Sequence, residues 1–225
     1  MPLLARSISL GLLHVMCKDI YQNPKGHEHD LLSLCCIDKT LNGWNLERTS
    51  SICRERCGGQ GYLSSNKFGD YIAIAHSALT AEGDNRVLMV KICKDMLTNI
   101  LKKGHKLPEL KNCPFRHTAK LQDVSQLETL SDLLKYRETV LFEKLVADTK
   151  NLKKAGVSGY NILMRETSDV MQNLATAYGE RQTLDYCISV LVNKIKNAQN
   201  KQMMMRVFRL FGAECINRDI SFYMI

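Results

Sequence analysis

One short stretch of the sequence combines residues that could hold a ligand through its backbone. Residues 54–62 contain Gly58, Gly59 and Gly61, which form a Gly-Gly-x-Gly pattern after an expected helix. Glycine lacks a Cβ, so the backbone amides of such a cluster can approach a ligand closely. Ordinary turns use the same pattern, and the glycines alone do not decide between the two roles.

A carboxylate follows about twenty residues later. Glu82 lies in residues 80–85, directly before a glycine and just outside the expected start of a helix. An acid near a helix N-terminus stabilises the helix dipole, and Asp84 or Asn85 can cap the same helix. A carboxylate on irregular backbone can also act as a general base. The residues alone favour the helix-start role for Glu82.

The elements around these segments are expected to be helical. The chain has 225 residues, 4 prolines and 45% hydrophobic residues, which suits a globular α-rich protein. Periodicity near 3.6 residues predicts helices over most of the chain, with an irregular glycine-rich segment before Gly83. In the first half of the chain, the expected helices are one over residues 3–21, a second from about Asp30, a shorter third that ends at Cys57, and a fourth after Gly83. In the second half, we expect one or two helices within residues 118–154, a pair within 158–197 with a kink at Gly179, and a last helix that starts with residues 202–211.

These helices predict an all-α fold without strands. We expect two antiparallel helical bundles, the first over residues 1–103 and the second over residues 118–225. Residues 104–117 contain Gly104, Pro108 and Pro114 and are expected to form a linker. The apolar stretch at residues 3–17 is interrupted by a charge and is not expected to be a signal peptide, and no stretch is long enough to span a bilayer.

Charge and cysteine content limit the kinds of partner that we expect. The net charge is +8, but Lys and Arg are spread along the chain, so a solvated basic surface is favoured over nucleic-acid binding. A basic surface could also attract an anion such as a CoA phosphate. Nine scattered cysteines indicate a reducing compartment. Cys53 with Cys57 and His27 with His29 lack a second pair at zinc spacing, so no metal is expected.

The order and separation of the two segments resemble the peroxisomal acyl-CoA oxidase family. Its members carry a Cys-Gly-Gly-x-Gly-Tyr stretch and then a Glu-Gly-Asp-Asn stretch that opens a helix. The resemblance spans most of the chain and is most specific between residues 50 and 97; within the family it is closest in character to the acyl-CoA oxidase-like group of animals. The matching stretches are residues 2–5, 56–59, 61–63, 66–69, 80, 82–85, 87–89 and 210–212.

The resemblance implies a role for Glu82. It would be the base that takes the α-proton of an acyl-CoA thioester, and its backbone N–H would help to hold the thioester oxygen. The products would be a trans-2-enoyl-CoA and, after electron transfer to dioxygen, hydrogen peroxide. The fold implied is the pair of helical bundles of the acyl-CoA oxidase and dehydrogenase C-terminal type.

The resemblance also implies a flavin cofactor. Gly58, Gly59 and Gly61 would line FAD, in this family typically across a dimer interface. Asp84 and Asn85 would contact the phosphate or adenosine side of the flavin cofactor. The implied partners are the acyl-CoA substrate and either a second copy or a complete oxidase subunit.

The sequence departs from the family pattern, and these departures change what we expect of its activity and location. Family members begin with a helical domain and a β-domain that hold most of the flavin and substrate, and this sequence contains neither. It ends without a Ser-Lys-Leu-type address. We therefore interpret the chain as a C-terminal fragment, inactive alone, peroxisomal by family and with a cytoplasmic location as the alternative.

Two alternative functions remain open. A non-catalytic helical module could retain the dimer-forming surface and pair with itself or with a complete subunit. An acyl-CoA dehydrogenase would use a base at the equivalent place but pass its electrons to a carrier protein. In either reading we expect the chain to self-associate, because bundles built to pack on other domains leave apolar faces uncovered.

Overall fold

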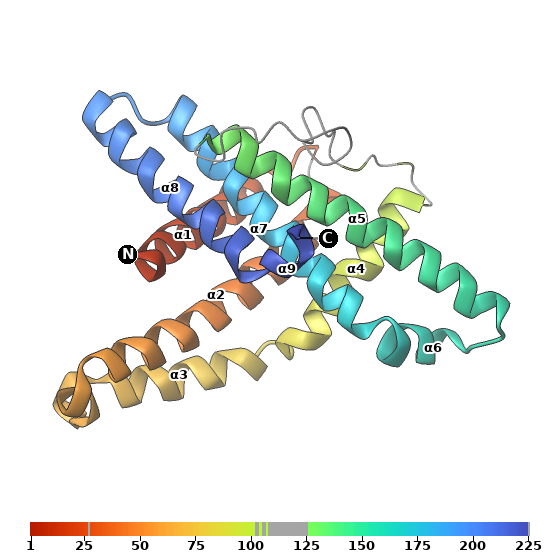
Figure 1. Cartoon of the computed structure of the whole chain (residues 1–225), viewed down its shortest axis with the longest axis horizontal. Coiled ribbons are helices and arrows are strands. Elements are labelled where there is room, and N and C mark those ends of the chain that lie inside the picture. The colour runs from red at the N-terminus through yellow and green to blue at the C-terminus, as the bar shows by residue number, and fades with distance from the viewer. Residues whose placement is uncertain (27, 102–103, 105–106, 108–125, 225) are drawn as a thin grey trace.

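The computed structural model describes residues 1–26, 28–101, 104, 107 and 126–224, and of residues 28–30 the backbone only. Every regular element in these ranges is helical, which confirms the predicted all-α fold (Figure 1). The elements are α1 (Pro2–Gln22), α2 (Glu28–Arg56), the 3-10 turns η1 (Gly58–Tyr62) and η2 (Ser64–Asn66), α3 (Phe68–Thr80), α4 (Asn85–Leu101), α5 (Leu127–Lys154), α6 (Gly159–Asn161), the π-helical turn η3 (Ile162–Glu166), α7 (Ser168–Asn193), α8 (Ala198–Arg218) and α9 (Ile220–Tyr223).

Two helices have the bounds that local signals indicate. Proline occupies the first turn of α1, where its missing N–H is not needed, and the helix ends at Gln22, one residue beyond the predicted end. α4 begins at Asn85, two residues after Gly83, which was expected to precede it. Both helices bury a spaced set of apolar residues, so the periodicity predicted them correctly.

The second and third predicted helices are one helix, and this prediction was wrong. α2 runs unbroken for 29 residues. Gly43 lies in its middle, where a Cβ would meet the Asn85 side chain at 3.4 Å and Leu79 at 3.6 Å. The glycine therefore allows α3 and α4 to approach α2 closely and does not interrupt the helix.

The expectation of irregular structure up to Gly83 was also wrong. Residues 68–80 form α3, a strongly apolar helix with Gly69 in its first turn, where glycine is tolerated. Phe68, Ile72, Ala75 and Leu79 recur at helical spacing and are its less exposed apolar side. Within residues 58–83, the glycine-rich residues before α3 and the turn after α3 lack a long helix.

The C-terminal helices follow the predicted order. Gly156 follows α5 with a φ of 78°, the left-handed conformation in which glycine commonly ends a helix. Gly179, the predicted kink, instead lies within α7 at a close crossing with α2, where a Cβ would be 2.2 Å from Ile37 Cγ1. The predicted linker and the start of the 118–154 helix fall largely outside the described residues.

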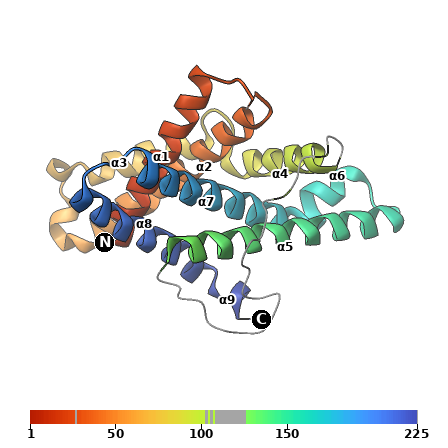
Figure 2. The ribbon, with the colours of Figure 1, turned by 90° about the horizontal axis from the view of Figure 1, so that it is seen from above.

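The hydrophobic core joins helices from both predicted bundles. Its larger cluster takes buried residues from α1, α2, α4, α5 and α7, and a smaller cluster lies between α5, α7 and α8. α5 and α7 lie side by side in both views (Figures 1 and 2). The division into two bundles stays a prediction, because α7 packs against helices of both predicted units.

The outer half of α2, the turns η1 and η2, and α3 project from this core, and we call them the α2–α3 arm (Figure 1). α3 packs mainly on α2 and on the turns at the tip of the arm. Tyr62, Tyr71 and Ile74 are exposed on it, at 83%, 51% and 58%. In the described part of the chain, no helix is both long and apolar enough to cross a membrane.

Candidate functional site

The turn between α3 and α4 has an unusual backbone. Glu82 has a φ of 59° and Gly83 a φ of 105°, so two successive residues adopt positive φ. A non-glycine residue in the left-handed region costs on the order of 1–2 kcal/mol. The Glu82 side chain is exposed, and none of the described residues forms a hydrogen bond or ion pair with it. The fold therefore holds Glu82 in a costly conformation without using its carboxylate.

Lys39 holds this turn from α2. Its ammonium donates to the Gly83 carbonyl oxygen at 2.7 Å, to Asn85 Oδ1 at 2.7 Å and to the Leu79 carbonyl oxygen at 3.4 Å. The contacts span the end of α3, the turn and the start of α4. One cation thereby satisfies carbonyl oxygens that the end of a helix leaves without partners. Lys39 was not foreseen, because nothing separates it from other lysines in the sequence.

Asp84, not Glu82, caps α4. Asp84 Oδ1 accepts hydrogen bonds from the backbone N–H of Arg86 at 2.8 Å and of Val87 at 3.3 Å. This confirms one of the two capping candidates and gives the helix-start role to a neighbour of Glu82. Asn85 is 2% exposed and donates to the Thr40 carbonyl oxygen while accepting from Lys39. Contact of either side chain with a flavin stays a prediction.

The three glycines at the tip of the arm differ in their surroundings. Gly58 has a φ of 58° and ends α2, and a Cβ on Gly58 or Gly59 would meet open space. Gly61 is buried, and a Cβ there would lie 2.1 Å from the Arg54 carbonyl oxygen. The close packing of η1 on α2 is therefore enough to explain why residue 61 is a glycine. Gly58 and Gly59 leave their backbone open to close approach from outside.

The structure does not bring the glycines and Glu82 together. They lie at opposite ends of α3, whose 13 residues span roughly 20 Å at the usual helical rise. Within one chain the two segments therefore face different surroundings. The cysteine pair lies at the same end as the glycines, with Cys57 exposed and Cys53 half-buried, while the His27 and His29 side chains lie outside the described residues.

Comparisons with known proteins agree with this arrangement of helices. Residues 1–97 match the family described as "Acyl-CoA oxidase, C-alpha1 domain". The mouse acyl-coenzyme A oxidase-like protein is 24% identical over 93% of this chain and 35% of its own length. The peroxisomal acyl-coenzyme A oxidase 2 of Arabidopsis thaliana is 31% identical over 43% of this chain and 15% of its own length.

Solved structures support the fold over nearly the whole chain. Acyl-CoA oxidase 3 of Yarrowia lipolytica superposes with a TM-score of 0.78 at 21% identity, covering 99% of this chain and 36% of that structure. Acyl-CoA oxidase 1 of Arabidopsis thaliana gives 0.78 at 19% identity, covering 98% and 36%.

The helices thus have the fold of the C-terminal half of acyl-CoA oxidases. Residues 1–97 are similar to the C-alpha1 domain of acyl-CoA oxidases, in agreement with the resemblance noted in the sequence. It spans about a third of the length of the mouse relative and of the solved structures.

Proposed function

We propose that this chain is the C-terminal helical part of a FAD-dependent acyl-CoA oxidase, with Glu82 as the catalytic base. The supporting observation is the turn itself: Glu82 has positive φ, an exposed carboxylate and a backbone held by Lys39. Residues kept in a costly conformation cluster at functional sites. Asp84 already caps α4, so the helix end does not need Glu82 for that purpose.

The chemistry asked of Glu82 is a proton transfer. Its carboxylate takes the α-proton of the acyl-CoA thioester as the β-carbon loses a hydride, and the α–β bond becomes a trans double bond. When FAD is bound, it supplies the hydride acceptor and passes the electrons to dioxygen, which gives hydrogen peroxide. The Glu82 side chain is exposed, so a substrate carbon can reach it.

Gly58 and Gly59 fit a role in holding FAD. Both are exposed, and the space beside their backbone is open. Because they lie at the far end of α3 from Glu82, we propose that they serve the cofactor of a neighbouring subunit. Asp84 lies beside Glu82, so in such a pair of subunits it would contact the cofactor from the side opposite to Gly58 and Gly59.

The 225 residues alone are proposed to be inactive. A base accelerates proton transfer only when substrate and hydride acceptor are held against it. Relatives are about three times as long, and the family implies that their additional domains hold most of the flavin and acyl-CoA. The names of the Arabidopsis relatives place them in peroxisomes, and we propose the same location here, with the cytoplasm as the alternative.

A second candidate function is a non-catalytic module that pairs with itself or with a complete subunit. The observation that favours it is the exposed apolar surface of the α2–α3 arm. An acyl-CoA dehydrogenase reaction remains the nearest alternative chemistry. It is distinguished by its electron acceptor, since an oxidase produces peroxide from dioxygen without a carrier protein.

The test replaces Glu82 in a protein that also carries the flavin-binding domains. Glu82→Gln keeps the shape of the side chain but removes the base, so peroxide production should fall by at least ~10²-fold. Acyl-CoA binding should change much less, because the amide still fills the site. Glu166→Gln, at an exposed acid in η3, is the matched control and should retain full activity.

Two results would contradict the proposal. If Glu82 is only a helix-start acid, Glu82→Gln lowers stability by roughly 0.3–1 kcal/mol and leaves turnover per folded molecule unchanged. Thermal midpoints measured beside peroxide production separate these cases. Robust turnover by the 225 residues alone would overturn the proposed dependence on further domains.

A further inference from the structure

A cavity of about 380 Å³ opens between α1, α2, α4, α7 and α8. Four arginines line it, and among its lining residues there is no carboxylate. Its remaining walls combine one aromatic ring, one leucine and four uncharged polar side chains. The lining residues are Arg6, Leu41, Trp44, Asn45, Arg48, Arg86, Gln172, Asn173, Thr176 and Arg218.

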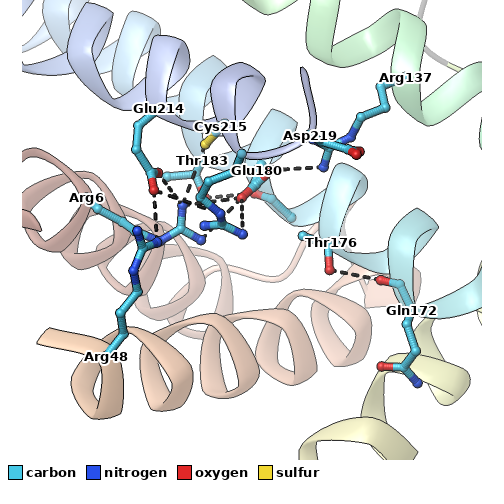
Figure 3. A network of polar contacts seen from close by, with 12 residues as sticks. Arg6, Arg48, Arg137, Gln172, Thr176, Glu180, Thr183, Glu214, Cys215 and Asp219 are labelled. Carbon is cyan, nitrogen blue, oxygen red and sulfur yellow. Dashed lines mark hydrogen bonds and ion pairs between the residues drawn. The ribbon is translucent and has the colours of Figure 1, made fainter. Parts of the chain in front are cut away.

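Carboxylates behind the cavity hold three of its arginines. Arg6 is 5% exposed and contacts Glu214 at 2.9 Å and Glu180 at 3.2 Å. Arg48 contacts Glu214 at 2.9 Å, and Arg218 contacts Glu180 at 3.4 Å. Figure 3 shows the Arg6 and Arg48 side chains meeting Glu214 from different helices. These contacts fix the guanidinium groups before any ligand arrives.

Positive charge is in excess at this place. The three paired arginines and Arg137 share the carboxylates of Glu180, Glu214 and Asp219. The fourth cavity arginine, Arg86, has no carboxylate partner within the described residues. Five guanidinium groups therefore face three carboxylates, and the excess is on the side of the cavity.

Arg86 is positioned without being neutralised. Its guanidinium carbon lies 5.7 Å from the centre of the Trp44 ring, and its backbone carbonyl accepts a hydrogen bond from Gln172 Nε2 at 2.9 Å. The ring attracts the cation but leaves the N–H groups at its edge available. An exposed arginine held in this way presents donors toward the cavity.

We propose that this cavity binds a phosphate-bearing small anion. Fixed guanidinium forks match phosphate oxygens in pairs, and an anion offsets the excess charge. The volume falls in the range of small-molecule sites, and Trp44 with Leu41 offers an apolar wall for the rest of the ligand. Glu82 and the glycines do not line the cavity, so this site stands apart from the proposed oxidase chemistry.

The single tryptophan of the chain supplies a direct readout. Inorganic pyrophosphate is titrated into the 225-residue protein at constant ionic strength, and Trp44 fluorescence and heat are recorded together. We expect saturable binding of one pyrophosphate per chain, with chloride at equal ionic strength producing no such change. Absence of saturation up to about 10 mM overturns the proposal.

Matched variants separate a site from general attraction. Arg86→Gln and Arg48→Gln should each weaken pyrophosphate binding by about tenfold, the loss expected for a charged hydrogen-bonding partner. Arg206→Gln removes the same charge from an exposed position on α8 and should change binding less than about twofold. Equal weakening by all three variants overturns the proposal. Circular dichroism establishes that each variant is folded.

Coenzyme A distinguishes a phosphate ester from an inorganic anion. If the physiological ligand is an ester, coenzyme A displaces pyrophosphate, binds more tightly and loses affinity in Arg86→Gln and Arg48→Gln alike. If pyrophosphate binds and coenzyme A does not compete, the site takes condensed or inorganic phosphate. Binding of coenzyme A that neither variant weakens contradicts the assignment of the ligand to this cavity.

Discussion

Glu180 is a carboxylate in the interior, with its side chain 1% exposed. Burial disfavours its charge, but the guanidinium groups of Arg137, Arg6 and Arg218 outweigh burial and hold the pKa of Glu180 below its usual value. Its two oxygens accept hydrogen bonds from Arg6 at 3.2 Å and Arg137 at 2.9 Å. The ionised carboxylate of Glu180 thus links α7 to α1 and α5.

Replacing this ion should be costly. Glu180→Gln leaves buried guanidinium groups without their counter-charge, and we expect a loss of roughly 3–5 kcal/mol in the free energy of unfolding. Glu128→Gln, at an exposed acid in the first turn of α5, should cost less than about 1 kcal/mol. Urea unfolding at pH 7 measures both. Equal, small losses would show that the buried network does not depend on the charge of Glu180.

The pH dependence has a definite sign. Because the folded pKa of Glu180 is lowered, its contribution is complete above the ordinary value of 4.5 and is lost as pH falls through the lower folded value. The difference between wild type and Glu180→Gln should therefore stay constant from pH 7 to 5 and shrink only below 4.5. A difference that shrinks already between pH 7 and 5 contradicts this reasoning.

At single residues the sequence was informative only where a signal is local. Asp84 is one residue before its helix, and its capping role could be read from that position. Glu180 pairs with Arg6 across 174 residues, and Lys39 contacts a turn more than 40 residues away. Neither partnership has a periodicity or spacing that could reveal it. The assignment of Glu82 came from resemblance to a family, since its residue type favoured a different role.

The crossing of α7 over α2 depends on one missing side chain. At Gly179 a Cβ would lie 2.2 Å from Ile37 Cγ1 and 2.8 Å from Leu41 Cδ1. Both neighbours are buried core residues. The close approach of these helices therefore requires glycine at this position.

Gly179→Ala should force the two helices apart. We expect a loss of about 1–3 kcal/mol in the free energy of unfolding, the usual cost of overpacking a filled core. Gly11→Ala in α1 is the matched control, because a Cβ there meets nothing within 4 Å. Removing that helical glycine should stabilise the protein by roughly 0.5–1 kcal/mol. Chemical denaturation of both variants decides the matter, and stabilisation of both would contradict the close crossing.

Helices were predicted well where a glycine has one common structural role, and poorly where a glycine can have several roles. Gly156 ends a helix, as expected of a glycine after a run of periodic residues. Gly43 and Gly179 lie inside helices for reasons of packing, which only the neighbouring helix reveals. α3 was missed because glycines and turn residues precede it, although its own apolar spacing is regular.

The whole molecule leaves one apolar helix poorly covered. Of the residues of α3 only Ala75 is buried, and Tyr71 and Ile74 are exposed. An exposed apolar patch on an otherwise solvated protein marks an interaction surface. We therefore expect the predicted self-association to use the α2–α3 arm.

Self-association should therefore be sensitive to a charge on α3. We expect the 225-residue chain to sediment as a dimer or larger species at micromolar concentration. Ile74→Glu should shift it toward monomer, because burying an unpaired carboxylate at an interface is unfavourable. Val192→Glu, at a residue 63% exposed on α7, serves as the control and should leave the distribution unchanged. A monomeric wild type would contradict the expectation.

The exposed surface of α3 also bears on how long the protein persists in a cell. Quality-control systems bind and remove chains that display apolar helices, so abundance follows the fraction of molecules whose surface is covered. The amount of this protein should then rise with the amount of whichever subunit covers α3, without any change in its synthesis. Because chains with an uncovered α3 are degraded, the amount of available partner would set the concentration of this protein.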